Sequence, residues 1–246
     1  MPVKTTPALR ATPPREGNRP NNGLALYLKR IFALMFGAVM ITAITSYITI
    51  YAGGITLLIG AGGFSWLFYV AMFGGLGLSI WAQVRAFSMS PTAGAISLII
   101  YSALMGLVIT PLVWGALAVN PASILQAFLI SAVMFGCMAL FGYKTVKDLS
   151  FLRIFLFIGM IGLLLTGMVS FIWPLGSTFA TIVCAIGVLV FALFTAYDMQ
   201  FLKRVYASGV GDDRQKNQLA VLGALHMYIS FIAMFQYILS LLNMRR

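Results

Sequence analysis

Residues 177–200 have the sequence STFATIVCAIGVLVFALFTAYDMQ, an apolar run that ends beside a carboxylate. A run of this length can cross the hydrocarbon core of a bilayer as an α-helix. Asp198 is the only acidic residue in any stretch that we assign to a membrane span. A carboxylate near hydrocarbon is costly, so it usually faces the bundle interior or water and marks an ion, proton or substrate path. The alternative is a helix-end carboxylate that only reaches headgroup water, and its position alone does not separate the two.

The whole chain shares this apolar character. Its 246 residues are 61% hydrophobic and only 9% charged, with a mean hydropathy of +0.98. These values are typical of an all-α polytopic membrane protein embedded in a lipid bilayer. We assign the net charge of +11 to basic flanks of membrane helices. We expect no nucleic-acid partner, because no soluble segment is long enough to form a binding domain for one.

The sequence predicts two parts. Residues 1–28 are rich in proline and basic side chains, so we expect a disordered, basic cytoplasmic segment. Residues 29–246 are expected to form a single membrane domain of seven helices. The expected spans cover about residues 31–51, 64–84, 93–114, 122–142, 154–173, 177–200 and 219–242.

The basic residues predict the orientation of these helices. Fourteen of the 16 Lys and Arg side chains fall in the N-terminal segment or in the connections after the second, fourth and sixth spans. Cytoplasmic loops carry the excess of Lys and Arg, so we expect a cytoplasmic N-terminus and an external C-terminus. Six spans with a re-entrant last segment would instead place Arg245 and Arg246 inside, and this remains the main alternative.

Polar stripes run along the last two expected helices. The stripe on the sixth helix has a spacing of four and three residues, which defines one helical face; it comprises Ser177, Thr181, Cys184, Val188, Phe191, Thr195 and Asp198. The stripe on the seventh helix comprises Gly223, His226, Ser230, Ala233, Tyr237 and Ser240. We expect the two stripes to face each other, which brings the intramembrane carboxylate near the single histidine of the chain.

The helical rise gives a first estimate of depth. For a turn centred near Val210, His226 lies about 6 Å deeper than Asp198, and Ser230 about 12 Å deeper, at 1.5 Å per residue. Asp198 and His226 are therefore expected to meet directly or through water. His226 is then either a packed histidine with one hydrogen-bond partner or a proton-sensitive group beside a carboxylate.

Three motifs together resemble the Bax-inhibitor family, also called the transmembrane Bax inhibitor motif proteins, and its bacterial members in particular. They are residues 142–150 (GYKTVKDLS), residues 194–200 (FTAYDMQ) and residues 223–232 (GALHMYISFI). The resemblance covers nearly all of the seven-helix region. It implies six helices around a central seventh helix, a pH-sensitive calcium leak and, for a bacterial member, the inner membrane.

The resemblance also implies site residues. In bacterial members an aspartate of the sixth helix and one of the seventh share a proton and gate the pore. Asp198 matches the first aspartate, but Ser230 stands where the second is expected. Arg85 is the nearest candidate for a basic residue that latches onto Asp198. The context of Asp198 adds three supporting residues: Thr195, Tyr197 and Gln200.

The missing aspartate weakens calcium binding, because Ca²⁺ prefers several oxygen ligands and one carboxylate with a hydroxyl is a poor set. Asp198 is thus a weak calcium candidate, and any pH response is expected to involve Asp198 with His226. We expect no bound cofactor, with Ca²⁺ at most a transported or bound ion, and no enzymatic activity. An alternative function is a non-transporting regulator that binds another membrane protein, such as a quality-control protease.

Overall fold

The computed structural model describes residues 20–60, 63–85, 90–172, 176–208 and 213–244. Nearly all of these residues are helical, as expected for a chain whose backbone groups must be hydrogen-bonded inside hydrocarbon. The elements are α1 (Pro20–Tyr51), α2 (Ile55–Leu58), β1 (Ile59–Gly60), β2 (Gly63–Phe64), α3 (Trp66–Val84), α4 (Pro91–Val119), α5 (Ala122–Lys144), α6 (Leu152–Ile172), α7 (Ser177–Ala207) and α8 (Asp213–Met244). Strands β1 and β2 form a short antiparallel hairpin between α2 and α3.

The prediction of seven membrane helices is confirmed. Among the described residues, seven helices are long and apolar enough to cross a membrane: α1, α3, α4, α5, α6, α7 and α8. Several extend beyond the expected limits, because hydropathy marks the edge of the hydrocarbon while the helix itself continues. The extension of α7 to Ala207 places Arg204 one turn after Gln200 on the same helix.

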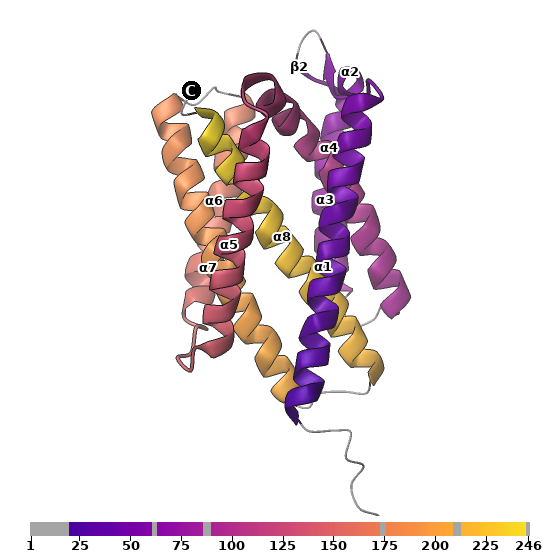
Figure 1. Cartoon of the computed structure of the whole chain (residues 1–246), viewed down its shortest axis with the longest axis vertical. Helices are drawn as coiled ribbons and strands as arrows, with labels where there is room; N and C mark the ends of the chain where they lie inside the picture. Colours follow the sequence, from indigo (N-terminus) through magenta and orange to yellow (C-terminus); the bar gives the residue numbers. More distant parts are fainter. Residues whose placement is uncertain (1–19, 61–62, 86–89, 173–175, 209–212, 245–246) are drawn as a thin grey trace, which may run out of the picture.

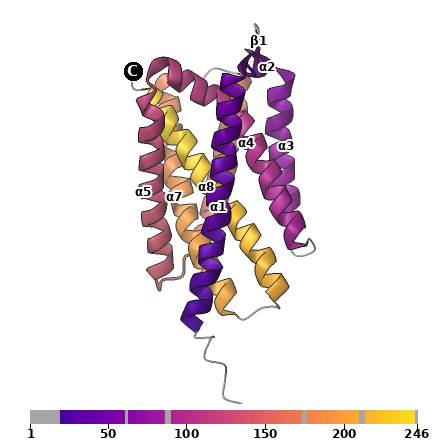
Figure 2. The ribbon, with the colours of Figure 1, turned by 45° about the vertical axis from the view of Figure 1, so that its right-hand side comes forward.

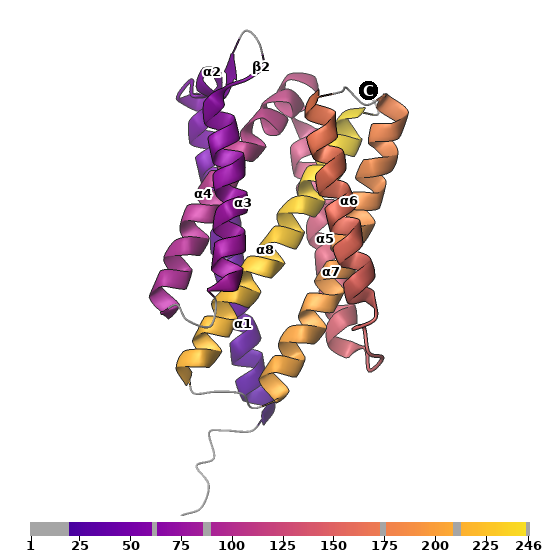
Figure 3. The same cartoon turned by 180° about the vertical axis from the view of Figure 1, so that it is seen from behind.

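The last membrane helix, α8, occupies the centre of the bundle, as the sequence resemblance implied. It runs obliquely between α1, α3 and α4 on one side and α5, α6 and α7 on the other (Figures 1 and 3). It contacts α1, α4, α5 and α7. In the most apolar part of α8, 72% of the residues are buried, whereas in α6 the corresponding share is 11%. Helix α8 is therefore enclosed by protein, and α6 is the most peripheral membrane helix.

The two ends of the bundle differ in the connections that they carry. The start of α1, the ends of α3, α5 and α7 and the starts of α4, α6 and α8 lie at one end, and α2, strands β1 and β2 and the end of α8 lie at the other (Figure 2). The basic connections identified in the sequence therefore share one end of the molecule. We expected residues 20–28 to be disordered, but they belong to α1. The apolar helix continues back through Leu24 and Leu26. Residues 1–19 and the arginines at 245 and 246 lie outside the described residues.

Glycines allow the closest helix contacts. A Cβ atom added to Gly142 of α5 would lie 2.1 Å from the carbonyl oxygen of Ala196 in α7. A Cβ atom at Gly187 of α7 would lie 2.7 Å from the ring of Tyr237 in α8. Small residues at membrane-helix interfaces let backbones approach in this way. The contact at Gly142 fixes α5 against α7 two residues before Asp198.

Candidate functional site

A polar cavity of about 340 Å³ lies between α3, α6, α7 and α8. Its polar lining combines an acidic, a basic, an imidazole, an amide and a hydroxyl side chain, and the remainder is largely aromatic. The lining residues are Gln83, Arg153, Phe157, Met160, Phe191, Phe194, Tyr197, Asp198, Phe201, His226, Ile229 and Ser230. The cavity thus brings together Asp198, His226 and Ser230, the three residues that the sequence singled out on the last two membrane helices.

Asp198 lies on the buried face of α7 and is only 8% exposed. The hydroxyl of Ser230 lies within hydrogen-bond reach of its carboxylate. The depth estimate that separated these two residues by about 12 Å is therefore wrong. The estimate assumed that both helix axes run straight across the membrane, whereas α8 crosses the bundle obliquely (Figure 3). The oblique course brings Ser230 to the level of Asp198, as the family resemblance implied.

His226 lines the same cavity but pairs with another residue. Its Nε2 atom lies 3.3 Å from Oε1 of Gln83 in α3. An amide oxygen only accepts, so this hydrogen bond requires the tautomer of His226 that carries its proton on Nε2. His226 therefore links α8 to α3 across the cavity, while Ser230 links α8 to Asp198 of α7.

The basic residue at the cavity comes from α6, whereas the sequence predicted one from the second membrane helix. Arg85, the expected latch, is the exposed C-terminal cap of α3, and the described lining of the cavity contains Gln83 from this helix instead. Arg153, in the first turn of α6, lines the cavity. Its position three residues after the motif 142–150 was the available signal, but only the packing of α6 against α7 reveals that it shares a cavity with Asp198.

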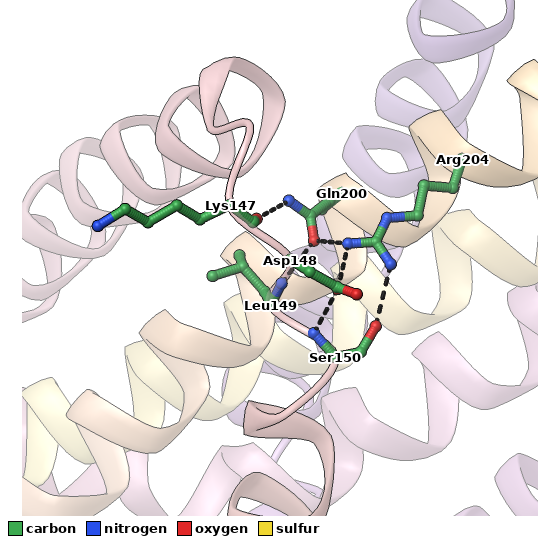
Figure 4. A network of polar contacts seen from close by, with 6 residues as sticks. All are labelled: Lys147, Asp148, Leu149, Ser150, Gln200 and Arg204. Carbon is green, nitrogen blue, oxygen red and sulfur yellow. Dashed lines mark hydrogen bonds and ion pairs between the residues drawn. The ribbon is translucent and has the colours of Figure 1, made fainter.

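The supporting residues have separate roles. Tyr197 lines the cavity. Thr195 is fully buried and donates to the carbonyl oxygen of Phe191 at 2.9 Å, a bond within its own helix. Gln200, 5% exposed, does not belong to the lining described above; its side chain binds the α5–α6 connection (Figure 4).

The donor set is small for a metal ion. Within the described part of the chain, no group of three or more His, Cys, Asp or Glu side chains is arranged to hold one. At the cavity, Asp198 supplies the only carboxylate among the lining residues, with the hydroxyl of Ser230 beside it. This set suits a proton or a weakly held cation better than tightly bound Ca²⁺, which takes six to eight oxygen ligands.

Comparisons with known proteins agree with the helix arrangement. The family model described as "Inhibitor of apoptosis-promoting Bax1" matches residues 24–246. The chain is 30% identical to the inner membrane protein YbhL of Escherichia coli over 230 residues, which cover 93% of this chain and 95% of YbhL. It is 30% identical to the uncharacterised protein RP147 of Rickettsia prowazekii over 227 residues, or 92% of each chain. This integral membrane protein therefore belongs to the Bax-inhibitor family.

Proposed function

We propose that this protein provides a pH-sensitive path for cations across the membrane, with Asp198 as its main ionisable gate. One observation carries the proposal. A carboxylate on a membrane-spanning helix is almost fully buried and lines a cavity with an imidazole, a hydroxyl and a guanidinium group. Ionisable groups inside membrane spans are costly and usually mark ion or proton paths.

The charge of Asp198 is the variable in this mechanism. When its carboxylate is ionised, the cavity holds a negative charge that can accept a cation or pair with the guanidinium of Arg153. When the carboxylate is protonated, this attraction is lost. The guanidinium of Arg153 then gives the cavity a net positive charge. A change in protonation therefore changes the electrostatic potential along the path, and the low polarity of the surrounding aromatic side chains strengthens the effect.

The ligand chemistry favours protons over calcium. The family resemblance implies two carboxylates at this level that share a proton, whereas this chain offers one carboxylate and the Ser230 hydroxyl. A single carboxylate also gives Ca²⁺ too few oxygen ligands for strong binding. We therefore expect proton flux to exceed calcium flux, with His226 as an additional group in the same cavity that can exchange a proton.

The proposal is tested by flux into reconstituted liposomes across a pH series. Asp198→Asn keeps the shape of the side chain and removes its charge, so proton and calcium flux should lose their pH dependence. His226→Ala should shift or narrow that dependence. Gln126→Ala, an exposed substitution near the other end of α5, is the matched control. Wild-type pH dependence in both Asp198→Asn and His226→Ala would contradict the proposal.

The proposed orientation places the basic end of the bundle in the cytoplasm and the C-terminus outside. It rests on the distribution of Lys and Arg. The printed name of the relative YbhL, an inner membrane protein, suggests the bacterial inner membrane. A phosphatase fused after Arg246 should be active in intact cells, since this enzyme requires the external side; a cytoplasmic reporter that is active there would overturn the orientation.

A second candidate function is the binding of another membrane protein. Helix α6 favours it, because only 11% of the residues in its most apolar part are buried, which leaves a long apolar face for lipid or a partner. The test is affinity capture after cross-linking in membranes. A partner that is lost on replacement of Ile158 or Leu165 of α6 by Ala, or on deletion of residues 1–19, would support this role for the corresponding segment. Flux without any such partner would favour the cation path.

A further inference from the structure

Two side chains of α7 hold the connection between α5 and α6. The amide of Gln200 accepts a hydrogen bond from the backbone N–H of Leu149 at 2.9 Å and donates one to the carbonyl oxygen of Lys147 at 2.8 Å (Figure 4). A side-chain amide that pairs with a backbone donor and a backbone acceptor fixes both the position and the orientation of that backbone. Because Gln200 is 5% exposed, water competes little for these bonds.

Arg204, one turn further along α7, extends the contact. Its guanidinium donates to the Ser150 hydroxyl at 3.0 Å, to the Asp148 carboxylate at 2.5 Å and to the side-chain oxygen of Gln200 (Figure 4). The side chains of Arg204 and Asp148 are 45% and 68% exposed, so water and dissolved salt screen their ion pair and weaken it. We call Gln200 and Arg204 together the α7 clamp, and the buried Gln200 is its stronger half.

The clamped residues continue directly into the first turn of α6. The backbone N–H of Leu152 donates to the carbonyl oxygen of Leu149 at 2.9 Å, and that of Arg153 donates to Ser150 at 3.1 Å. A continuous set of hydrogen bonds therefore leads from Gln200 through the connection to Arg153, which lines the cavity of Asp198. Gln200 lies two residues after Asp198. The clamp therefore fixes the position of Arg153 relative to α7, the helix that carries the carboxylate.

Helix α6 has few other restraints. It is the least buried membrane helix, and its main contact is with α7. Segments with few buried contacts open locally at a lower free energy than the core. At the end of α6 next to the cavity, the α7 clamp therefore adds to the apolar contacts of Leu152 and the buried Leu156.

We propose that Gln200, assisted by Arg204, is a positioning residue that holds α6 and Arg153 against α7 and so restricts access to the Asp198 cavity from the basic end. The inference rests on the proposed function for its biological meaning. Its physical content, the accessibility of the cavity, can be measured without any ion flux.

The experiment measures modification of a cysteine in the cavity of the full chain in lipid nanodiscs. Cys137 and Cys184 are first replaced by Ala, and Met160, which lines the cavity from α6, is replaced by Cys. A charged, membrane-impermeant thiol reagent then reports access. Loss of the two hydrogen bonds of the Gln200 amide, one buried and one part-buried, should raise the modification rate about tenfold in Gln200→Ala. Arg204→Ala, which removes exposed contacts, should raise it about threefold.

Two controls separate local opening from general loosening. Gln126→Ala applies the same substitution to an exposed position and should leave the rate unchanged. A reporter cysteine at Leu117, in a different cavity, should keep its own rate in Gln200→Ala. Two results would overturn the proposal. One is an unchanged modification rate of the Met160→Cys reporter in folded Gln200→Ala; the other is an equal increase in rate at both reporters.

A variant that fails to fold does not remove the test. If Gln200→Ala is not monodisperse, Gln200→Glu replaces it, since glutamate keeps the acceptor for Leu149 and lacks the donor to Lys147. Faster modification in this variant supports the clamp, and the parental rate contradicts it. Wild-type pH dependence of flux in both Asp198→Asn and His226→Ala would refute the proposed function alone, because the accessibility result does not depend on transport.

Discussion

Among the described residues, a polar cavity and an apolar groove of similar size lie on different sides of α8. The polar cavity of about 340 Å³ contains Asp198, whereas a groove of about 450 Å³ between α1, α4, α5 and α8 is almost entirely apolar. On α8, Ser230 lines the first and Phe231 lines the second. Successive residues of a helix point about 100° apart, so one helix can serve both. The polar cavity is therefore distinguished from the apolar groove, as a candidate ion site, by the charge of its lining residues and not by its volume.

The two sides also differ in how their polar groups are satisfied. At the edge of the groove, the Thr42 hydroxyl lies 2.5 Å from the hydroxyl of Tyr228 and donates to the carbonyl oxygen of Ser102 at 2.9 Å. These neutral groups satisfy each other and lock α1 to α4 and α8. The polar cavity is lined by both an acidic and a basic side chain, Asp198 and Arg153, so its net charge depends on protonation. We therefore expect substitutions near the groove to change stability, and substitutions in the polar cavity to change pH dependence.

The largest effect should come from Gly142→Ala, which tests the tight packing behind the polar cavity. The added Cβ would lie 2.1 Å from the carbonyl oxygen of Ala196, a backbone atom that cannot move aside by rotation of a side chain. Overpacking of this kind should cost at least about 2 kcal/mol, measured as a loss of thermal stability in detergent. The matched control is Gly136→Ala on the same helix, where no atom lies within 4 Å of the added Cβ. Equal stability of the two variants would contradict the packing at Gly142.

The next effect sharpens the polar side of the comparison. Ser230→Asp places a second carboxylate beside Asp198, so the pair should titrate in two coupled steps. Two carboxylates also improve the oxygen ligand set for Ca²⁺, and calcium flux into liposomes should rise severalfold. The double variant Asp198→Asn/Ser230→Asp retains one carboxylate and should lose this gain. No change in calcium flux for Ser230→Asp would argue against the cavity as the path.

A smaller effect is expected on the groove side. Tyr228→Phe removes the hydroxyl that pairs with Thr42, and the remaining partners of Thr42 limit the loss to about 0.6–1.7 kcal/mol. Thermal stability should fall, while the pH dependence of flux should stay as in the wild type. Tyr51→Phe, at an exposed position of the same groove, should leave both properties unchanged. A changed pH dependence in Tyr228→Phe would extend the ion path to the groove side of α8.

The smallest effect concerns pH at the α7 clamp. Hydrogen bonds from the side chain and backbone of Ser150, together with the Arg204 guanidinium, lower the pKa of the Asp148 carboxyl to about 2. The pKa of Asp148 is depressed in the folded state, so its contribution is complete above the usual aspartate pKa of about 4 and is lost only as pH falls towards 2. The accessibility of the Met160→Cys reporter in Asp148→Asn should therefore differ from the parent by the same small factor at pH 5 and at pH 8. A difference that grows between these values would make the clamp itself a pH sensor.

Part of the candidate site followed from the sequence. Asp198 was identified because a carboxylate inside an apolar run is rare, and Ser230 because of its place in a family motif. Arg153 and Gln83 were missed, because each lies at the end of a membrane helix, where polar side chains are common. The depth of Ser230 was misjudged, because helical rise gives distances along a helix but not the angle at which two helices cross.

The sequence by itself determined the all-α membrane class, the seven spans and the family, since apolar runs of spanning length and three ordered motifs are local properties of the chain. Only the tertiary structure decided that α8 crosses the bundle obliquely, that its two faces line a polar cavity and an apolar groove, and that Arg153 shares the first of these with Asp198. The physical reason is that hydrophobicity fixes where a helix enters the membrane. Its neighbours are chosen by side-chain packing, as at Gly142 against Ala196, which involves residues far apart in the chain.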